Sequence, residues 1–184
     1  MRIANTVHDS IVDGQGLRFT VFTQGCPHRC PGCHNPGTHD PAGGRDVSVA
    51  ALVEELTKNP LMAGLTLSGG EPFAQAADCA ALAKAAHGLG LTVWTYTGYL
   101  FEHLRDAGRA DWTALLQETD VLVDGPFLQD QKSYELHFRA AETSGSSTWP
   151  PAWSRESPSS GRRRTPWPNS PSPNPERRGK GVCV

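Results

Sequence analysis

The sequence lacks long apolar runs. No stretch of its 184 residues approaches the roughly 20 apolar residues that a membrane-spanning helix needs. The first residues, MRIANTVHDSIVDG, also lack the apolar core of a signal peptide. We therefore expect a soluble, cytoplasmic chain without a membrane partner, and its length suits one domain.

Cysteine is scarce, and its spacing excludes a secreted disulfide framework. The chain has five Cys residues, an odd number, and three of them, Cys26, Cys30 and Cys33, lie within eight residues. In a reducing compartment such clustering indicates metal or redox chemistry. Cys79 lies apart in an alanine-rich segment, where we expect a small core residue, and Cys183 lies near the end.

The composition changes after Arg139. The stretch up to Arg139 holds 10 of the 17 Lys and Arg residues and 16 of the 19 Asp and Glu residues. The stretch 140–184 holds 8 of the 15 Pro residues, is rich in Ser and Arg, and shows no periodicity. Such a stretch cannot bury enough apolar surface to offset chain entropy. We predict one domain over 1–139 and a disordered tail over 140–184.

Strands and helices alternate along the first 139 residues. The patterns predict strands at 17–25, 65–70, 91–98 and 121–127, and helices at 47–60, 74–90, 99–108 and 111–120. Alternation predicts a parallel sheet, in which the loops that follow the strands meet at one edge and build the active site. Because an eight-stranded barrel needs about 250 residues, we expect an α/β fold that forms a partial, open (βα) barrel.

The spacing C-x3-C-x2-C supplies three thiolates and suits two kinds of metal site. Structural zinc takes four ligands, so His28, His34 or His39 would have to complete the set. A [4Fe–4S] cluster held by three Cys residues keeps one iron open for a substrate. Gly32, between the second and third Cys, would let the backbone approach such a cluster. Outside a zinc site, we expect His28 and His39 to face solvent.

Two motifs together resemble the radical S-adenosylmethionine superfamily. The cysteine motif is followed, after the next predicted strand, by SGGEP at residues 68–72. By itself SGGEP would fit an ordinary strand-to-helix turn. The resemblance implies that Cys26, Cys30 and Cys33 bind a [4Fe–4S] cluster and that Glu71 receives the ammonium group of the methionine moiety. The other contacts that it implies for S-adenosyl-L-methionine come from Gly32, Cys33, His34, Ser68, Gly69 and Gly70.

Longer stretches narrow the resemblance. IVDGQGLRFTVFTQGCPHRCPGCHNPGTHD, LTLSGGEPF, VWTYTGY and VLVDGPF together are similar to the activating proteins of anaerobic ribonucleoside-triphosphate reductase. The resemblance implies an oxidoreductase that uses one electron from a flavodoxin-like donor to cleave S-adenosylmethionine. The 5′-deoxyadenosyl radical then takes a hydrogen atom from a glycine of the large reductase subunit, so we expect no catalytic residue beyond the cofactor ligands. Other small radical enzymes, such as further glycyl-radical activases or deazaguanine synthases, and a zinc-binding module are the alternatives.

The end typical of this family is missing. After Arg139 the family continues with GSxNQR and a short strand, whereas this chain reads AAETSGSSTW. Codons exist for this stretch that, read from the last base of the Arg139 codon, translate as GSRNQRLIDV. We therefore interpret 140–184 as a frameshifted reading of a GC-rich gene. This interpretation argues against a nucleic-acid partner for the basic run 162–164.

Overall fold

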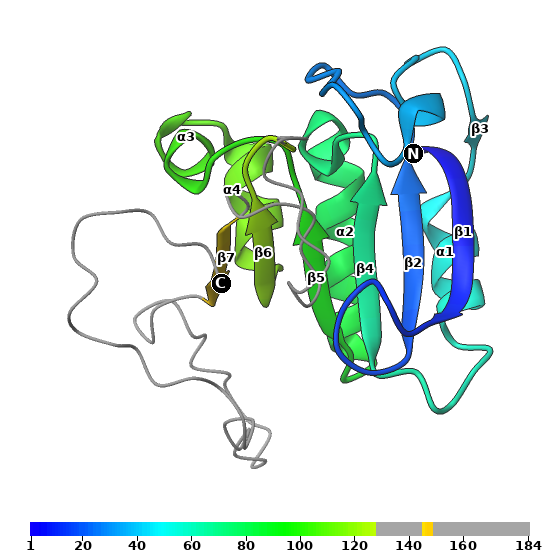
Figure 1. Ribbon diagram of the computed structural model, residues 1–184. Helices are drawn as coiled ribbons and strands as arrows, with labels where there is room; N and C mark the ends of the chain where they lie inside the picture. The colour runs from blue at the N-terminus through cyan, green and yellow to red at the C-terminus, as the bar shows by residue number, and fades with distance from the viewer. Residues whose placement is uncertain (128–144, 149–184) are drawn as a thin grey trace.

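A seven-stranded sheet in the order β3-β1-β2-β4-β5-β6-β7 forms the centre of the molecule (Figure 1). The structure is a computed structural model that describes residues 1–127 and 145–148. The strands are β1 (Arg2–Ser10), β2 (Arg18–Thr23), β3 (Arg45–Asp46), β4 (Gly64–Gly69), β5 (Thr92–Tyr96), β6 (Val121–Asp124) and β7 (Gly145–Thr148). The helices are α1 (Val49–Leu56), α2 (Ala76–Gly88), α3 (Phe101–Asp106) and α4 (Ala110–Gln117), with short 3-10 turns η1 (Pro36–Thr38) and η2 (Pro72–Gln75).

The central strands β2, β4, β5 and β6 run parallel to one another, and helices lie between them in the sequence. This arrangement confirms the predicted α/β class with an open sheet, whose two edges in the described part of the chain are β3 and β7. Ser48 caps the start of α1, because its hydroxyl accepts the Ala51 N–H at 3.1 Å. In Figure 1 the carboxyl ends of β2 and β4 point to the upper edge, where the loops after them lie.

Three strands depart from the predicted parallel sheet. β1 and β3 pair antiparallel with each other, β1 pairs antiparallel with β2, and β7 pairs antiparallel with β6. The prediction missed β1 because Ile3 and Val7 are the main apolar residues of a polar stretch, which leaves little alternation to detect. β7 lies inside the stretch predicted to be disordered. The rest of that stretch, and with it the frameshift interpretation, lies outside the described residues.

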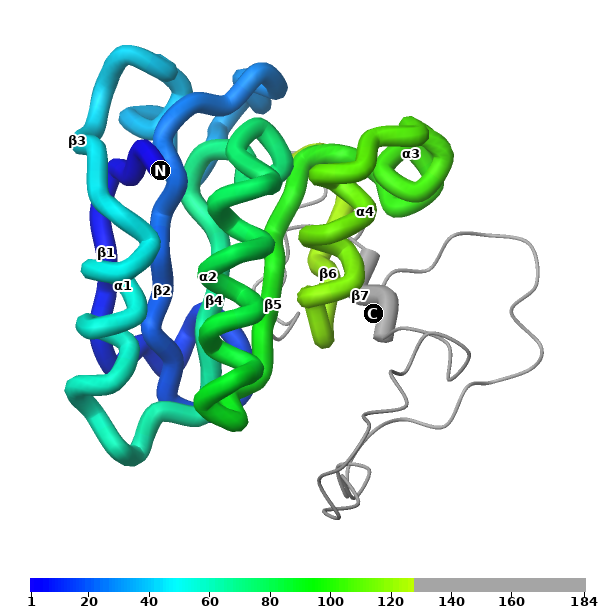
Figure 2. The backbone as a smooth tube through the Cα atoms, turned by 180° about the vertical axis from the view of Figure 1, so that it is seen from behind, coloured from blue at the N-terminus to red at the C-terminus, as the bar shows by residue number. Residues whose placement is uncertain are grey.

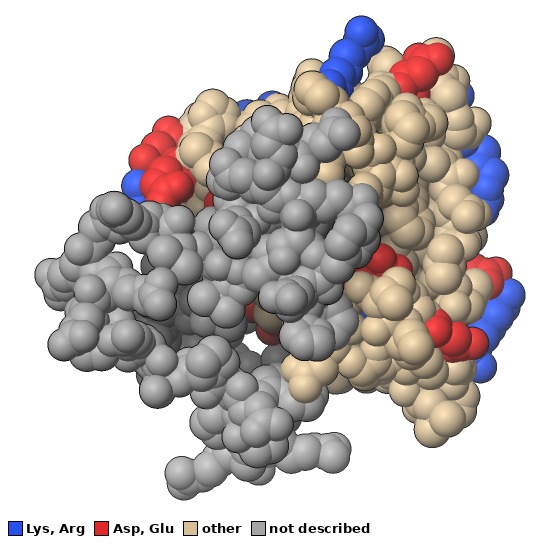
Figure 3. Space-filling view, in the orientation of Figure 1, with Lys and Arg blue, Asp and Glu red and all other residues tan. Residues whose placement is uncertain are grey.

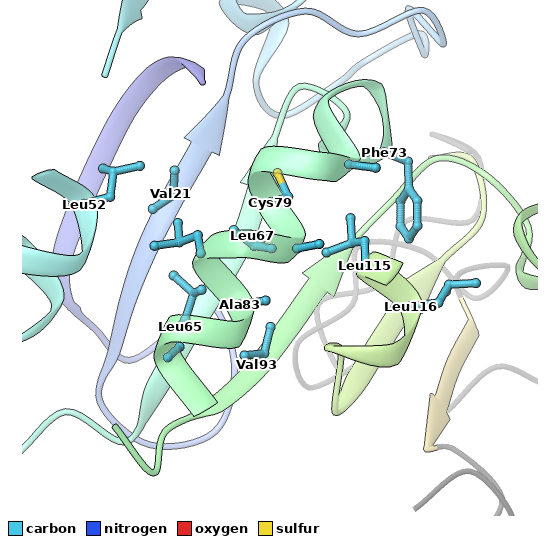
Figure 4. Close-up of a cluster of buried hydrophobic side chains, with 14 of the residues drawn as sticks. Val21, Leu52, Leu65, Leu67, Phe73, Cys79, Ala83, Val93, Leu115 and Leu116 are labelled. Carbon is cyan, nitrogen blue, oxygen red and sulfur yellow. The ribbon is translucent and has the colours of Figure 1, made fainter. Parts of the chain in front are cut away.

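Helices α1, α2 and α4 cover one face of the sheet, as Figure 2 shows from behind. Alanine-rich α2 lies between α1 and α4, and its small side chains allow close packing on β4 and β5. The thiol of Cys79 is fully buried in this core, as predicted, and burial raises its pKa. Other members of the cluster, labelled in Figure 4, are Val21, Leu52, Leu65, Leu67, Phe73, Ala83, Val93, Leu115 and Leu116.

Arg18 is the largest fully buried side chain, and it lies at the amino end of β2. Its guanidinium donates to the Thr66 hydroxyl at 2.6 Å and lies 5.4 Å from the centre of the Trp94 ring. Burial lowers the pKa of Arg18 to about 10. The hydrogen bonds that surround this cation join β2, β4 and β5 at the end of the sheet opposite the cysteines.

The visible surface carries charges of both signs. Where the grey atoms of Figure 3 leave this face uncovered, Lys and Arg side chains are interspersed with Asp and Glu side chains. Within the described ranges, no helix has the length and apolar character needed to cross a membrane.

His87, near the carboxyl end of α2, contacts two carboxylates at once. Its Nδ1 lies 2.8 Å from Glu118 Oε2, and its Nε2 lies 2.9 Å from Asp120 Oδ2. The hydrogen bond with Asp120, supported by the one with Glu118, raises the pKa of His87 above its ordinary value of 6.5. The imidazole therefore ties α2 to the end of α4 and the start of β6.

The raised pKa of His87 predicts a pH-dependent stability. Because the folded state binds this proton more tightly, the stabilisation is complete below about pH 6.5 and is lost as the pH rises through the raised pKa. We expect the difference in unfolding free energy between wild type and His87→Gln to be largest near about pH 6 and smaller by about pH 9.

Urea titrations followed by circular dichroism measure this difference. Lys84→Gln removes an exposed cation from the same helix, and its difference from wild type should stay nearly constant over this range. A His87→Gln difference that does not change with pH would contradict the prediction.

Candidate functional site

Loops after all four parallel strands line one pocket at the carboxyl edge of the sheet. Six predicted site residues lie in its wall: the three clustered Cys residues together with Ser68, Gly69 and Gly70. Gly32 and His34 are exposed and lie outside the wall, although the His34 ring packs on the Phe127 ring with centroids 4.8 Å apart. The remaining lining residues are His28, Tyr96, Thr97, Gly98, Val123, Gly125 and Phe127.

The cysteine loop follows β2, and the chain after it returns to the carboxyl end of that strand. The Gly25 N–H donates to Thr38 O at 2.8 Å, and the Cys26 N–H donates to His39 O at 3.2 Å. Farther along, the Cys33 N–H closes a turn on Cys30 O at 3.2 Å. These bonds carry the chain around the pocket, and all three Cys residues lie in its wall.

The three thiols are free and half-buried. Burial raises the pKa of Cys26, so this thiol keeps its proton until a metal displaces it. The Asn35 N–H lies 3.3 Å from Cys33 Sγ, where it would stabilise a thiolate. Three such sulfur donors in one wall fit a [4Fe–4S] cluster that takes three protein ligands and keeps one iron open.

A single zinc ion would need a histidine beside the three thiols. In the described part of the chain, no three His, Cys, Asp or Glu side chains are gathered closely enough to hold a metal ion. His28 binds Glu71, and His34 packs on Phe127. His39 has a buried Nε2 atom without a hydrogen-bond partner among the described residues, so the expectation that it faces solvent was wrong for this atom.

The turn after β4 is bonded to the chain that leads into the cysteine loop. The Gly70 N–H donates to Thr23 O at 2.8 Å, and the Glu71 N–H donates to Gly25 O at 2.9 Å. Gly69 has a φ of +91°, and a Cβ atom on Gly70 would lie 2.5 Å from Gly25 O. Glycine is therefore required at both positions, and its absence of side chains lets the two motifs share one pocket.

Glu71 supports the pocket from behind its wall. The residue is 0% exposed, and its Oε1 accepts the Phe73 N–H at 3.0 Å and the Thr97 hydroxyl at 2.9 Å. Its Oε2 accepts the Gly98 N–H at 2.9 Å and lies 2.8 Å from His28 Nε2. The suggested contact of Glu71 with an ammonium group stays a prediction, and the contacts present in the structure are with the protein itself.

Comparisons with known proteins agree with this geometry. Residues 12–144 match the family described as 4Fe-4S single cluster domain. The anaerobic ribonucleoside-triphosphate reductase-activating protein of Vibrio cholerae is 34% identical over 143 residues, which cover 71% of this chain and 87% of the relative. The protein of the same name from Escherichia coli K12 is 33% identical over 139 residues, or 71% of this chain and 88% of the relative.

A further relative widens the comparison. The pyruvate formate-lyase-activating enzyme of Clostridium pasteurianum is 30% identical over 165 residues, which cover 80% of this chain and 66% of that enzyme. The chain belongs to the radical S-adenosylmethionine glycyl-radical activases. The zinc-binding alternative from the sequence is thereby set aside.

Several parts of this activase pocket lie outside the cysteine motif and SGGEP. The loops after β5 and β6 supply Gly98, Gly125 and Phe127 to the wall. Asp124 Oδ2 accepts the Phe101 N–H at 2.7 Å and so holds the start of α3, and burial raises the pKa of Asp124. The motifs TYTGY and VLVDGPF carry these residues, and their position after strands was the available signal.

The contacts of Glu71 predict that it is essential for stability. Glu71→Ala would leave two backbone N–H groups and the Thr97 hydroxyl without their acceptor. We expect the unfolding free energy to fall by about 3 kcal/mol or more, because each unsatisfied buried group costs about 1–3 kcal/mol. The matched control is Glu102→Ala, an exposed site on α3, which should change stability by less than about 0.5 kcal/mol. Equal urea midpoints for the two variants would refute the structural role of Glu71.

Proposed function

We propose that this chain activates anaerobic ribonucleoside-triphosphate reductase by generating a glycyl radical in its large subunit. The observation that supports the proposal most directly is the shared pocket, in which three free thiols lie beside a glycine turn bonded to their loop. A [4Fe–4S] cluster held by Cys26, Cys30 and Cys33 would supply the electron, taken from a flavodoxin-like donor, for the reductive cleavage of S-adenosyl-L-methionine to methionine and a 5′-deoxyadenosyl radical, and the target glycine would give up the hydrogen atom.

The residues of the chain would bind and orient these groups. Cys26, Cys30 and Cys33 would hold the cluster with one thiolate each, which would leave one iron without a protein ligand. The half-buried backbone of Gly69 and Gly70 would lie along the methionine moiety, with Ser68 beside it. Tyr96 and Phe127 would form an aromatic wall that keeps water from the reacting atoms, as radical chemistry requires.

Two further contacts belong to the outer rim of the pocket. Gly32 and His34 are exposed next to the third Cys, and His34 already packs on Phe127 of the wall. We propose that the adenine of S-adenosylmethionine stacks at this rim, where an aromatic ring and open space are both present.

Coverage of the relatives favours the reductase as the target. The activating proteins named for the reductase match this chain over 87–88% of their own length in two species. The relative named for pyruvate formate-lyase matches over 66% of its length. The match therefore covers more of the reductase activators than of the lyase activator.

The cofactor chemistry can be tested without the protein partner. Anaerobic protein reconstituted with iron and sulfide should be brown and should form 5′-deoxyadenosine from S-adenosylmethionine and dithionite. Cys30→Ala should lose this product, since one of three iron ligands is missing. Cys79→Ala changes a buried core thiol away from the pocket and should retain the product. A colourless wild type that takes up zinc and no iron would overturn the proposal.

The target can be tested by mixing the reconstituted protein with each candidate partner. We expect the electron paramagnetic resonance doublet of a glycyl radical with the large subunit of anaerobic ribonucleoside-triphosphate reductase, and no such signal with pyruvate formate-lyase. The reverse pattern would assign this chain to the lyase. Product without a signal from either partner would place its target elsewhere.

A further inference from the structure

His28 lies in the middle of the cysteine loop, and its side chain is 17% exposed in the pocket wall. The expectation from the sequence that it faces solvent was wrong. Its ring Nε2 lies 2.8 Å from Oε2 of Glu71, a residue 43 positions away in the chain. Because this oxygen also accepts the Gly98 N–H, we assign the N–H of this contact to His28.

The His28 ring is enclosed on its other sides as well. The Tyr99 ring meets it edge-on with centroids 4.4 Å apart. Tyr99 is held in turn by the Trp112 ring, with centroids 4.8 Å apart. A Cβ atom on Gly98 would lie 2.5 Å from His28 Cδ2, so the backbone after β5 packs directly against the imidazole.

The backbone of the cysteine loop has few contacts of its own. Among the described residues, no backbone N–H of residues 27–32 donates to a backbone carbonyl. The anchors of the loop at Cys26 and Cys33 lie at its ends. Its middle is therefore held to the rest of the pocket by side chains, and the contact of His28 with Glu71 reaches a carboxylate that is fixed to η2 and to the end of β5.

We propose that His28 is a positioning residue that latches the cysteine loop to Glu71. The latch holds Cys26 and Cys30 over the pocket before any cluster is bound, so that three thiols are presented together. Because Glu71 is also bonded to the turns after β4 and β5, the latch fixes the cysteine loop relative to these two turns. This inference rests on the proposed function only in taking these thiols as the cluster ligands.

The latch can be tested on the full chain without iron, by following alkylation of each Cys with iodoacetamide and peptide mass spectrometry. His28→Ala should raise the alkylation rates of Cys26 and Cys30 about tenfold, the factor expected when a hydrogen bond to a charged group is lost. His28→Gln should stay near the wild-type rates, because its amide nitrogen can replace Nε2 as the donor to Glu71.

Matched controls separate the latch from general loosening. His34→Ala removes an exposed imidazole of the same loop, which packs on Phe127, and should leave the alkylation rate of Cys26 unchanged. Cys79 is fully buried and should react slowly in every variant that is folded. If His28→Ala fails to fold, the alkylation rate of its Cys79 will rise. The alkylation rates of Gly98→Ala then test the latch instead.

A second variant displaces the imidazole without removing it. Gly98 has no positive φ, so alanine suits its backbone, and the nearest atoms that a new Cβ would meet all belong to the His28 ring. Gly98→Ala should therefore reproduce the fast alkylation of His28→Ala. The double variant that combines His28→Ala with Gly98→Ala should be alkylated no faster than His28→Ala alone, because both changes remove the same contact between His28 and Glu71.

The outcomes distinguish this inference from the proposed function. After reconstitution, His28→Ala should release iron to a chelator several-fold faster than wild type, and His28→Gln should not. Alkylation rates in His28→Ala and Gly98→Ala that equal those of wild type would refute the latch, even if wild type binds a cluster. A wild type that binds no cluster would refute the proposed function, while the alkylation rates would still decide the latch.

Discussion

The buried carboxylate of Glu71 joins three loops that are distant in sequence, and the shape of the pocket depends on it. It accepts hydrogen bonds from η2, from the end of β5 and from the cysteine loop. A carboxylate removed from water is stable only when such donors surround it, so these loops and this side chain require one another. The glycine turn before Glu71 and the cysteine motif are thereby two parts of one structure.

The parallel sheet places these loops within reach of each other. Four parallel strands end at the same edge, and each is followed by residues that line the pocket. The helices that return the chain between these strands lie on one face, where alanine-rich α2 packs closely on the central strands. The core thus fixes the strands, and the strands fix the origin of each loop.

Backbone hydrogen bonds hold the two ends of the cysteine loop, and side chains hold its middle. Such a loop can present three thiols and still adjust as iron and sulfide bind, because few backbone hydrogen bonds must break. Burial raises the pKa of Cys26, so this thiol holds its proton more tightly than an exposed thiol does. A metal that binds Cys26 must displace this proton. The pocket is therefore ordered by its neighbours more than by its own backbone.

The sequence by itself determined the central strands and helices and the cluster of three Cys residues, because these depend on local periodicity and short spacing. It did not determine β1, whose few apolar residues form no clear pattern, or the antiparallel pairing at both edges of the sheet. Only the tertiary structure decided that Glu71 is buried and that His28 faces it, since these two residues are separated by 43 positions. A hydrogen bond over that distance in the chain leaves no trace in local pattern, because it depends on where the strands place the loops.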